Sequence, residues 1–185
     1  MNSPHSRNLR LHRVVDESET FFVTKSVHPK KPALDEAARE IVVSALQFAL
    51  ESHRIYLGAF AVMPDHWHAL IALIEPWTLP KFMHATMSFV GARTQRHLNA
   101  NGMRWQDGYY DTLVKTGKQF SYFVDYIGEN PVAKGLVEQR EQWIASSAHR
   151  IDLITDPWPW LYDEEAVGAL RPLPHFDQAR STRQE

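Results

Sequence analysis

The spacing of apolar residues predicts a strand and then a helix in the first part of the chain. FFVTKSV (21–27) is rich in residues that favour β-strands, and the following HPKKP ends the run. Residues 35–53 follow a helical period, with Ile41, Ala45 and Phe48 recurring on one side. Asp35 stands where an N-cap belongs, and acidic residues occupy the first turn.

The next apolar runs predict a β-hairpin. RIYLGAFAVM (54–63) and HWHALIAL (66–73) are short and rich in β-forming residues, and Pro64 and Asp65 between them favour a turn. Only this turn separates the two runs, so we expect the strands to pair with each other.

Two further helices and one further strand are predicted beyond the hairpin. Residues 79–98 have a helical period and predict a helix. WQDGYYDTLVK (105–115) predicts a strand, with Asp107–Gly108 forming the turn that leads into it. GKQFSYFVDYIGENPV (117–132) predicts a third helix. We expect that helix to end before Pro131, because proline disfavours helical geometry at the residue preceding it.

The predicted order of elements is β-α-β-β-α-β-α, which is the ferredoxin-like (split βαβ) order followed by one more helix. It predicts an α+β protein with an antiparallel sheet and helices mainly on one face. We divide the chain into a polar N-terminal arm (1–19), one main domain (20–150) and a Pro-rich acidic C-terminal tail (151–185).

Composition narrows the class of protein. The 185 residues carry a formal net charge of −2 and no cysteine, which excludes disulfides, thiolate metal sites and a cysteine nucleophile. No apolar run approaches the roughly 20 residues of a membrane span, no signal-peptide pattern is present, and no GxxxxGK[ST] motif for a nucleotide cofactor occurs. We therefore expect a soluble cytoplasmic protein that does not contact a membrane.

His66 and His68 stand out in an otherwise apolar strand. Side chains alternate along a strand, so both imidazoles point to one side of the sheet and Trp67 points to the other. Two neutral imidazoles can share a divalent cation, although a third ligand would have to come from elsewhere. Alternatively, the two histidines are polar residues on a solvent-facing edge.

The third helix supplies two more candidates. Its apolar stripe, which should face the sheet, consists of Phe120, Phe123, Val124 and Ile127. Tyr126 and Asn130 lie four residues apart at the margin of this stripe, where they can reach over the sheet. A phenol can act as a nucleophile and an amide oxygen suits Mg²⁺ or Mn²⁺. Packing at a helix boundary and at a helix end would explain the same residues.

Taken together, MPDHWHALI, WQDGYYD and YIGENPVAKGLV resemble the HUH single-tyrosine transposases of the IS200-like family, and in particular the REP-associated tyrosine transposases. The resemblance covers roughly residues 20–150. Asp65 stands where that family usually has asparagine, and Val-Ala-Lys-Gly replaces the usual Val-Lys-Ala-Gly. Neither departure changes a candidate ligand.

The resemblance implies a metal-dependent enzyme that nicks single-stranded DNA at palindromic hairpins and transfers the strand. His66, His68 and Asn130 would hold Mg²⁺ or Mn²⁺, and Tyr126 on the extra C-terminal helix would form a 5′-phosphotyrosine intermediate. Tyr110 is a rival nucleophile, but it has no comparable ligand four residues later.

The implied partner is a DNA hairpin with a single-stranded flank, bound by a chain that we expect to be a monomer rather than a dimer. The candidate phosphate contacts are Arg10, Arg13, Lys25, Arg93, Arg96, Arg104 and Lys115. The alternative function is a non-catalytic nucleic-acid hairpin-binding module in which the site is vestigial. A replication or conjugation initiator is disfavoured because no helicase or primase segment is appended.

Overall fold

The computed structural model describes residues 19–98 and 105–155. In chain order, the elements are β1 (Thr20–Ser26), α1 (Glu36–Glu51), β2 (Ile55–Val62), β3 (His66–Leu73), α2 (Leu79–His97), β4 (Tyr110–Val114), α3 (Gly117–Ala133), and the 3-10 helices η1 (Arg140–Gln142) and η2 (Ile151–Leu153). Within these residues, no helix has the length and apolar character needed to cross a lipid bilayer.

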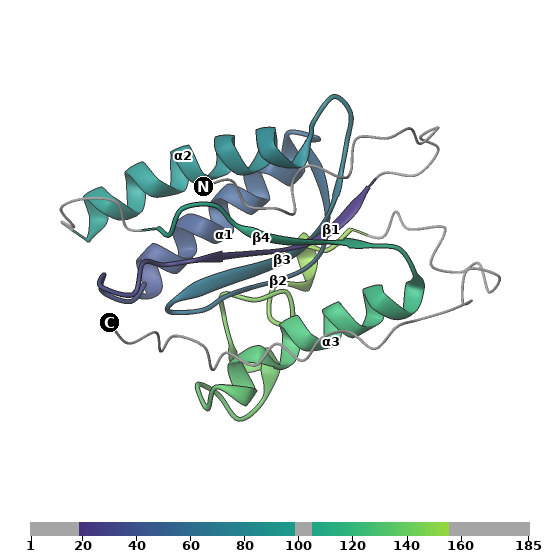
Figure 1. Ribbon diagram of the computed structural model, residues 1–185. Coiled ribbons are helices and arrows are strands. Elements are labelled where there is room, and N and C mark those ends of the chain that lie inside the picture. The colour runs from purple at the N-terminus through teal and green to yellow at the C-terminus, as the bar shows by residue number, and fades with distance from the viewer. Residues whose placement is uncertain (1–18, 99–104, 156–185) are drawn as a thin grey trace, which may run out of the picture.

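The strands form one antiparallel sheet in the order β2-β3-β1-β4 (Figure 1). The β2–β3 pair is the predicted hairpin, and β1 lies between β3 and β4. This arrangement confirms the predicted α+β fold with a split βαβ order. Thr24 of β1 pairs with His68 of β3, so the middle of β1 lies directly beside the two histidines.

The first two helices cover one face of the sheet and enclose the larger core. Val23, Trp67 and Ile71 face these helices from the sheet and are fully buried. Asp35 caps α1 as predicted, because its carboxylate accepts a hydrogen bond from the amide of Ala38 at 2.8 Å.

The predicted inner stripe of α1 was wrong in one position. Phe48 is 55% exposed, and the guanidinium of Arg54 lies over its ring. The helix instead buries the stripe that includes Val42, Leu46 and Ala49. Several apolar residues follow one another in this helix, so its sequence fits more than one inner stripe, and packing against the sheet selects one.

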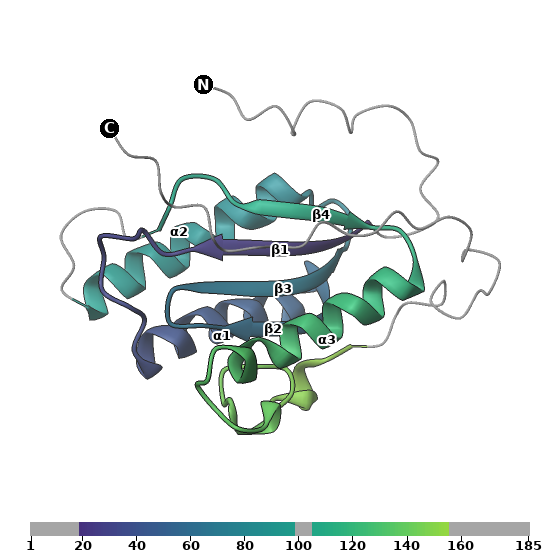
Figure 2. The ribbon, with the colours of Figure 1, turned by 60° about the horizontal axis from the view of Figure 1, so that its bottom comes forward.

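The third helix lies on the opposite face of the sheet, away from α1 and α2 (Figure 2). Phe123 and Ile127 are buried there, and the ring of Phe123 stacks on Phe22 of β1 at 4.3 Å between centroids. Phe120 and Val124 pack at the edge of the same small core, so the predicted apolar stripe is confirmed. Helices therefore pack on both faces of the sheet.

The end of α3 differs from the prediction, whereas the fourth strand agrees with it. α3 continues through Pro131 to Ala133, because Pro131 lies in the last turn and removes a single backbone donor there. The next turn still closes, with the amide of Lys134 donating to Asn130 O at 3.1 Å. β4 begins at Tyr110, after the predicted turn, in which Gly108 adopts a positive φ of 68°; Trp105 contributes only an isolated bridge.

Residues after α3 return to the far edge of the sheet. Leu153 is buried in the larger core. The amide of Thr155 donates to Leu57 O of β2, and the amide of Leu57 donates to the hydroxyl of Thr155. The packed domain thus continues beyond the predicted boundary at residue 150. The predicted arm, apart from residue 19, and the tail from residue 156 lie outside the described residues.

Candidate active site

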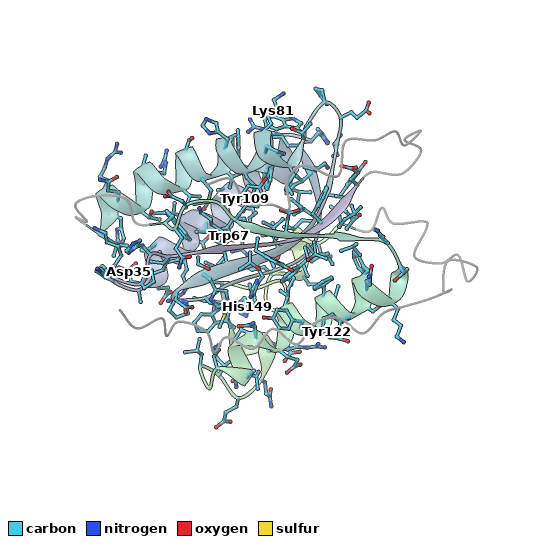
Figure 3. All side chains as sticks on the ribbon, in the orientation of Figure 1. Asp35, Trp67, Lys81, Tyr109, Tyr122 and His149 are labelled. Atoms are coloured by element: carbon cyan, nitrogen blue, oxygen red, sulfur yellow. The ribbon has the colours of Figure 1, made fainter. Side chains whose placement is uncertain are left out.

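The two histidines lie side by side on the α3 face of the sheet. His66 is 4% exposed and His68 is 3% exposed, and their ring centroids are 4.5 Å apart. Trp67 points into the opposite core, as strand alternation predicted, and Figure 3 shows it across the sheet from Tyr122 of α3. The two imidazoles are therefore buried residues between sheet and helix, and the alternative of a solvent-facing edge is wrong.

The hairpin tip that carries His66 is fastened to neighbouring segments. The amide of Met63 donates to His66 O at 2.7 Å and closes the turn. The turn's own carbonyls are also used: Asp65 O accepts from Val27, and Pro64 O accepts from Leu34, both at 2.7 Å. Because the backbone around the turn is bonded on both sides, the histidine at its end has a defined position.

Each imidazole is oriented by a hydrogen bond to its Nδ1 atom. Nδ1 of His66 lies 2.6 Å from a carboxylate oxygen of Asp65, and Nδ1 of His68 lies 2.7 Å from the hydroxyl of Thr24. A carboxylate only accepts, so Nδ1 of His66 carries a proton, and in the neutral ring Nε2 then has the lone pair. Nε2 of His66 is buried and has no hydrogen-bond partner. This is how metal-binding histidines are commonly held.

Asn130 and Tyr126 face the histidines from α3. Asn130 is 6% exposed; its Nδ2 is 3.5 Å from Nε2 of His68, and its Oδ1 is buried without a partner. The ring of Tyr126 lies 5.3 Å from that of His68 and contacts Phe22 edge-on at 5.9 Å. The helix thus brings both predicted residues to the two histidines, one turn apart, as their spacing requires.

Burial sets the protonation of these groups. It lowers the pKa of His68 well below the ordinary value, and the charge of neighbouring His66 lowers it further, so the ring is neutral at physiological pH. Burial also raises the pKa of the Tyr126 phenol, with a further rise from Tyr122, while hydrogen bonding by Asn130 opposes the rise. The resting phenol therefore keeps its proton.

The donor atoms suit a divalent cation with an incomplete protein shell. Among the described residues, no three His, Cys, Asp or Glu side chains gather at one point. The available set is instead His66, His68 and the Asn130 amide, of which Nε2 of His66 and Oδ1 of Asn130 are buried without partners. Buried polar atoms normally have a hydrogen-bond partner, so two unpartnered atoms in one site indicate a binding position for a group that would contact both. Imidazole and amide oxygen are ordinary ligands of Mn²⁺ and Mg²⁺.

Of the four predicted phosphate contacts that the structure describes, three lie on the opposite side of the sheet from this site. Lys25 is buried on the α1/α2 side, where its ammonium donates to the carbonyls of Gln106 and Gly108, so its surroundings do not support a phosphate contact. Arg93 and Arg96 are exposed on α2, in that same layer. Lys115 is exposed at the junction of β4 and α3 and remains a candidate. The other three lie outside the described residues: Arg10, Arg13 and Arg104.

Sequence reasoning did not identify the partners of the two histidines. Asp65 was noted only as a departure from a motif, although its position before His66 was a local signal. Thr24 gave no such signal, because His68 follows it by 44 positions and the two meet only through the pairing of β1 with β3.

Comparison with known proteins gives the family. A family model described as "Transposase IS200 like" matches residues 21–130, which is more than half of the chain. The chain belongs to the IS200-like transposase family. The matched region runs from β1 to Asn130, so it includes every residue of the site described above.

Two curated relatives with similar sequences come from bacteria. The REP-associated tyrosine transposase of Escherichia coli (strain K12) is 26% identical over 133 residues, which cover 71% of this chain and 77% of that protein. The putative REP-associated tyrosine transposase of Haemophilus influenzae (strain ATCC 51907 / DSM 11121 / KW20 / Rd) is 29% identical over 117 residues, covering 58% of this chain and 66% of that protein. These matches confirm the resemblance found in the sequence.

The fold agrees with a solved member of the family. A REP-associated tyrosine transposase bound to a REP hairpin superposes with a TM-score of 0.59 at 21% identity, covering 87% of this chain and 98% of that one. At this identity the match establishes a common fold.

Proposed function

We propose that this IS200-like transposase nicks single-stranded DNA beside a hairpin and rejoins it, using Tyr126 as the nucleophile. His66, His68 and Asn130 would hold the Mg²⁺ or Mn²⁺ on which the reaction depends. The DNA hairpin is proposed as the substrate because a relative with the same fold was solved with a REP hairpin.

The observation that supports this proposal most directly is the pair of buried, unpartnered atoms beside the phenol. Nε2 of His66 and Oδ1 of Asn130 come from different elements, yet both belong to residues that adjoin His68, whose ring lies 5.3 Å from that of Tyr126. A protein that only bound hairpins would gain nothing from burying these atoms, since unsatisfied polar groups destabilise the fold. A metal ligand set that leaves positions open for a phosphate accounts for them.

The chain's residues have separate roles in the proposed reaction. Asp65 and Thr24 orient the two imidazoles, and α3 holds the phenol against Phe22. When bound, a divalent cation would neutralise the charge of a phosphodiester oxygen and orient the phosphate for in-line attack.

Cleavage would form one phosphorus–oxygen bond and break another. The phenol oxygen of Tyr126 attacks phosphorus and loses its proton as the bond between phosphorus and the 3′-oxygen breaks. The departing 3′-oxygen gains a proton, leaving a 5′-phosphotyrosine and a free 3′-hydroxyl. The reverse reaction with another 3′-hydroxyl releases Tyr126 and completes strand transfer. No nucleotide cofactor is required, because the covalent intermediate conserves the phosphodiester bond.

A denaturing gel tests this directly. A labelled hairpin oligonucleotide from repeats flanking the gene is incubated with the protein and Mn²⁺ or Mg²⁺. The expected result is a covalent protein–DNA band that disappears with chelator, in Tyr126→Phe and in His66→Ala. Tyr110→Phe is the matched control, and its band should remain. Tight binding without a covalent band on the cognate hairpin would instead support the non-catalytic hairpin-binding module.

A further inference from the structure

α3 covers only part of its face of the sheet. Its contacts with the sheet are mainly with β2, then with β3, and Figure 2 shows β1 and β4 lying to one side of the helix. On that side Tyr110 of β4 is 45% exposed and Thr112 is half-buried. Tyr110 pairs with Thr24, whose side chain reaches His68, so Tyr110 lies on the same face as the two histidines.

A second exposed tyrosine borders the same area from α3. Tyr122 is 44% exposed and lies one helical turn before Tyr126. The rings of Tyr122 and Tyr126 are nearly parallel, with an interplanar angle of 15° and centroids 6.3 Å apart. Tyr122 also contacts Phe123 edge-on at 5.4 Å, which fixes the direction of its ring. An oriented, accessible aromatic face therefore lies directly beside the proposed nucleophile.

Charges near this area favour a polyanion. Lys115 and Lys118 are exposed where β4 passes into α3. The acidic residues of α3, Asp125 and Glu129, are instead paired electrostatically with Arg140, which lies beyond the helix in η1. A strand of nucleic acid that lay over β1 and β4 would thus meet Lys115 and Lys118 on one side.

We propose that Tyr122 and Tyr110 form a nucleobase-stacking site for the unpaired DNA next to the phosphate that Tyr126 attacks. This inference rests on the proposed function and names the part of the substrate that these residues recognise. Stacking on tyrosine tolerates any base, because every base has a π-face. The site would therefore hold the single strand in place and leave sequence recognition to other contacts.

Fluorescence binding measurements test the proposal without any cleavage. In the Tyr126→Phe background, the full chain is titrated against hairpin oligonucleotides that each carry 2-aminopurine at one unpaired position. We expect strong quenching of 2-aminopurine at one or two positions on binding. Tyr122→Ala should abolish that quenching and weaken affinity by about 5- to 150-fold, the range that base–aromatic stacking contributes. Tyr122→Phe should retain both, because the ring remains.

A matched control separates stacking from a general loss of aromatic surface. Phe89 of α2 is 41% exposed, similar to Tyr122, but lies in the opposite helical layer. Phe89→Ala should change neither quenching nor affinity. Tyr110→Ala should reduce quenching at a different position from Tyr122→Ala.

Unchanged affinity and quenching in a folded Tyr122→Ala protein would overturn the proposal, and would indicate that the exposed rings serve another partner such as a protein. The proposed function would stand in that case if the wild-type chain still gave its metal-dependent covalent band. Conversely, position-specific quenching without a covalent band would retain the stacking site and reject the nuclease.

Discussion

The hydroxyl of Thr24 is a small group whose removal should have two separate effects. It lies 2.7 Å from Nδ1 of His68, a ring that is only 3% exposed. Thr24→Val keeps the shape of the side chain and removes only this partner. A buried nitrogen left without a hydrogen bond costs about 1–3 kcal/mol. Since Thr24 itself is only half-buried and water can partly replace it, we expect a loss of about 1–2 kcal/mol in the free energy of unfolding.

The second effect concerns the proposed metal. A ligand histidine must present the lone pair of Nε2, which requires its proton on Nδ1, where Thr24 accepts it. Without the hydroxyl, that form of His68 loses its stabilising partner. Loss of such a partner typically weakens metal binding by about 10- to 100-fold, and we expect Mn²⁺ affinity to fall within this range.

Two measurements distinguish these effects. Urea unfolding in the presence of chelator, followed by tryptophan fluorescence, gives the stability, and the expected loss corresponds to a Tm about 2–8 °C lower for a chain of this size. Electron paramagnetic resonance of free Mn²⁺ gives the affinity. Thr112→Val is the control: its hydroxyl donates to Tyr110 in an exposed contact of 3.3 Å and should change stability by less than about 0.5 kcal/mol. Equal stability and equal Mn²⁺ affinity in Thr24→Val would refute the reasoning.

Three further predictions concern other parts of the molecule. Below the ordinary pKa of 6.5, His68 is protonated in the unfolded chain but not in the folded chain, so the free energy of unfolding should decrease as the pH is lowered below 6.5. Urea unfolding at several pH values, with chelator present, should show a smaller decrease for His68→Gln than for the wild-type chain. Phe123→Ala removes a buried ring stacked on Phe22 and should cost about 3–5 kcal/mol in the same assay, and a cost below about 1 kcal/mol would contradict the packing of α3. Lys115→Gln should reduce the salt dependence of DNA binding by about 0.7 in the log–log slope, whereas Lys25→Met should lower stability and leave that slope unchanged.

Local periodicity was sufficient to predict much of the site. Alternation along one strand places His66 and His68 on the same side, and four-residue spacing places Tyr126 next to Asn130 on one helix, so neither prediction depends on distant contacts. The meeting of the two pairs is different. It depends on which face of the sheet α3 covers, and the resemblance to a family supplied that information before the structure did.

The residues that sequence reasoning misjudged depend on tertiary contacts. Lys25 lies on the same side of β1 as Val23, so strand alternation already indicated that it faces the core. Its burial depends on the loop at Gln106, whose carbonyl accepts a hydrogen bond from the Lys25 ammonium. Tertiary packing also decides the other two residues. The stripe of α1 that packs on the sheet leaves Phe48 exposed, and the last turn of α3 retains Pro131 although proline disfavours a helix. Composition and residue spacing do not predict such contacts between residues that are distant in the sequence.

The placement of α3 alone on its face has a consequence for motion within the folded state. The helix is attached through a small cluster that includes Phe22, Phe123 and Ile127, while the larger core lies on the other side of the sheet. A partial opening that lifts α3 can therefore separate Tyr126 from the histidines while the α1/α2 layer stays intact. Amide hydrogen exchange should show α3 exchanging sooner than β1 and β3. Because the proposed ligand set includes residues of both parts, Mn²⁺ should slow exchange in α3 selectively by linking the helix to the sheet.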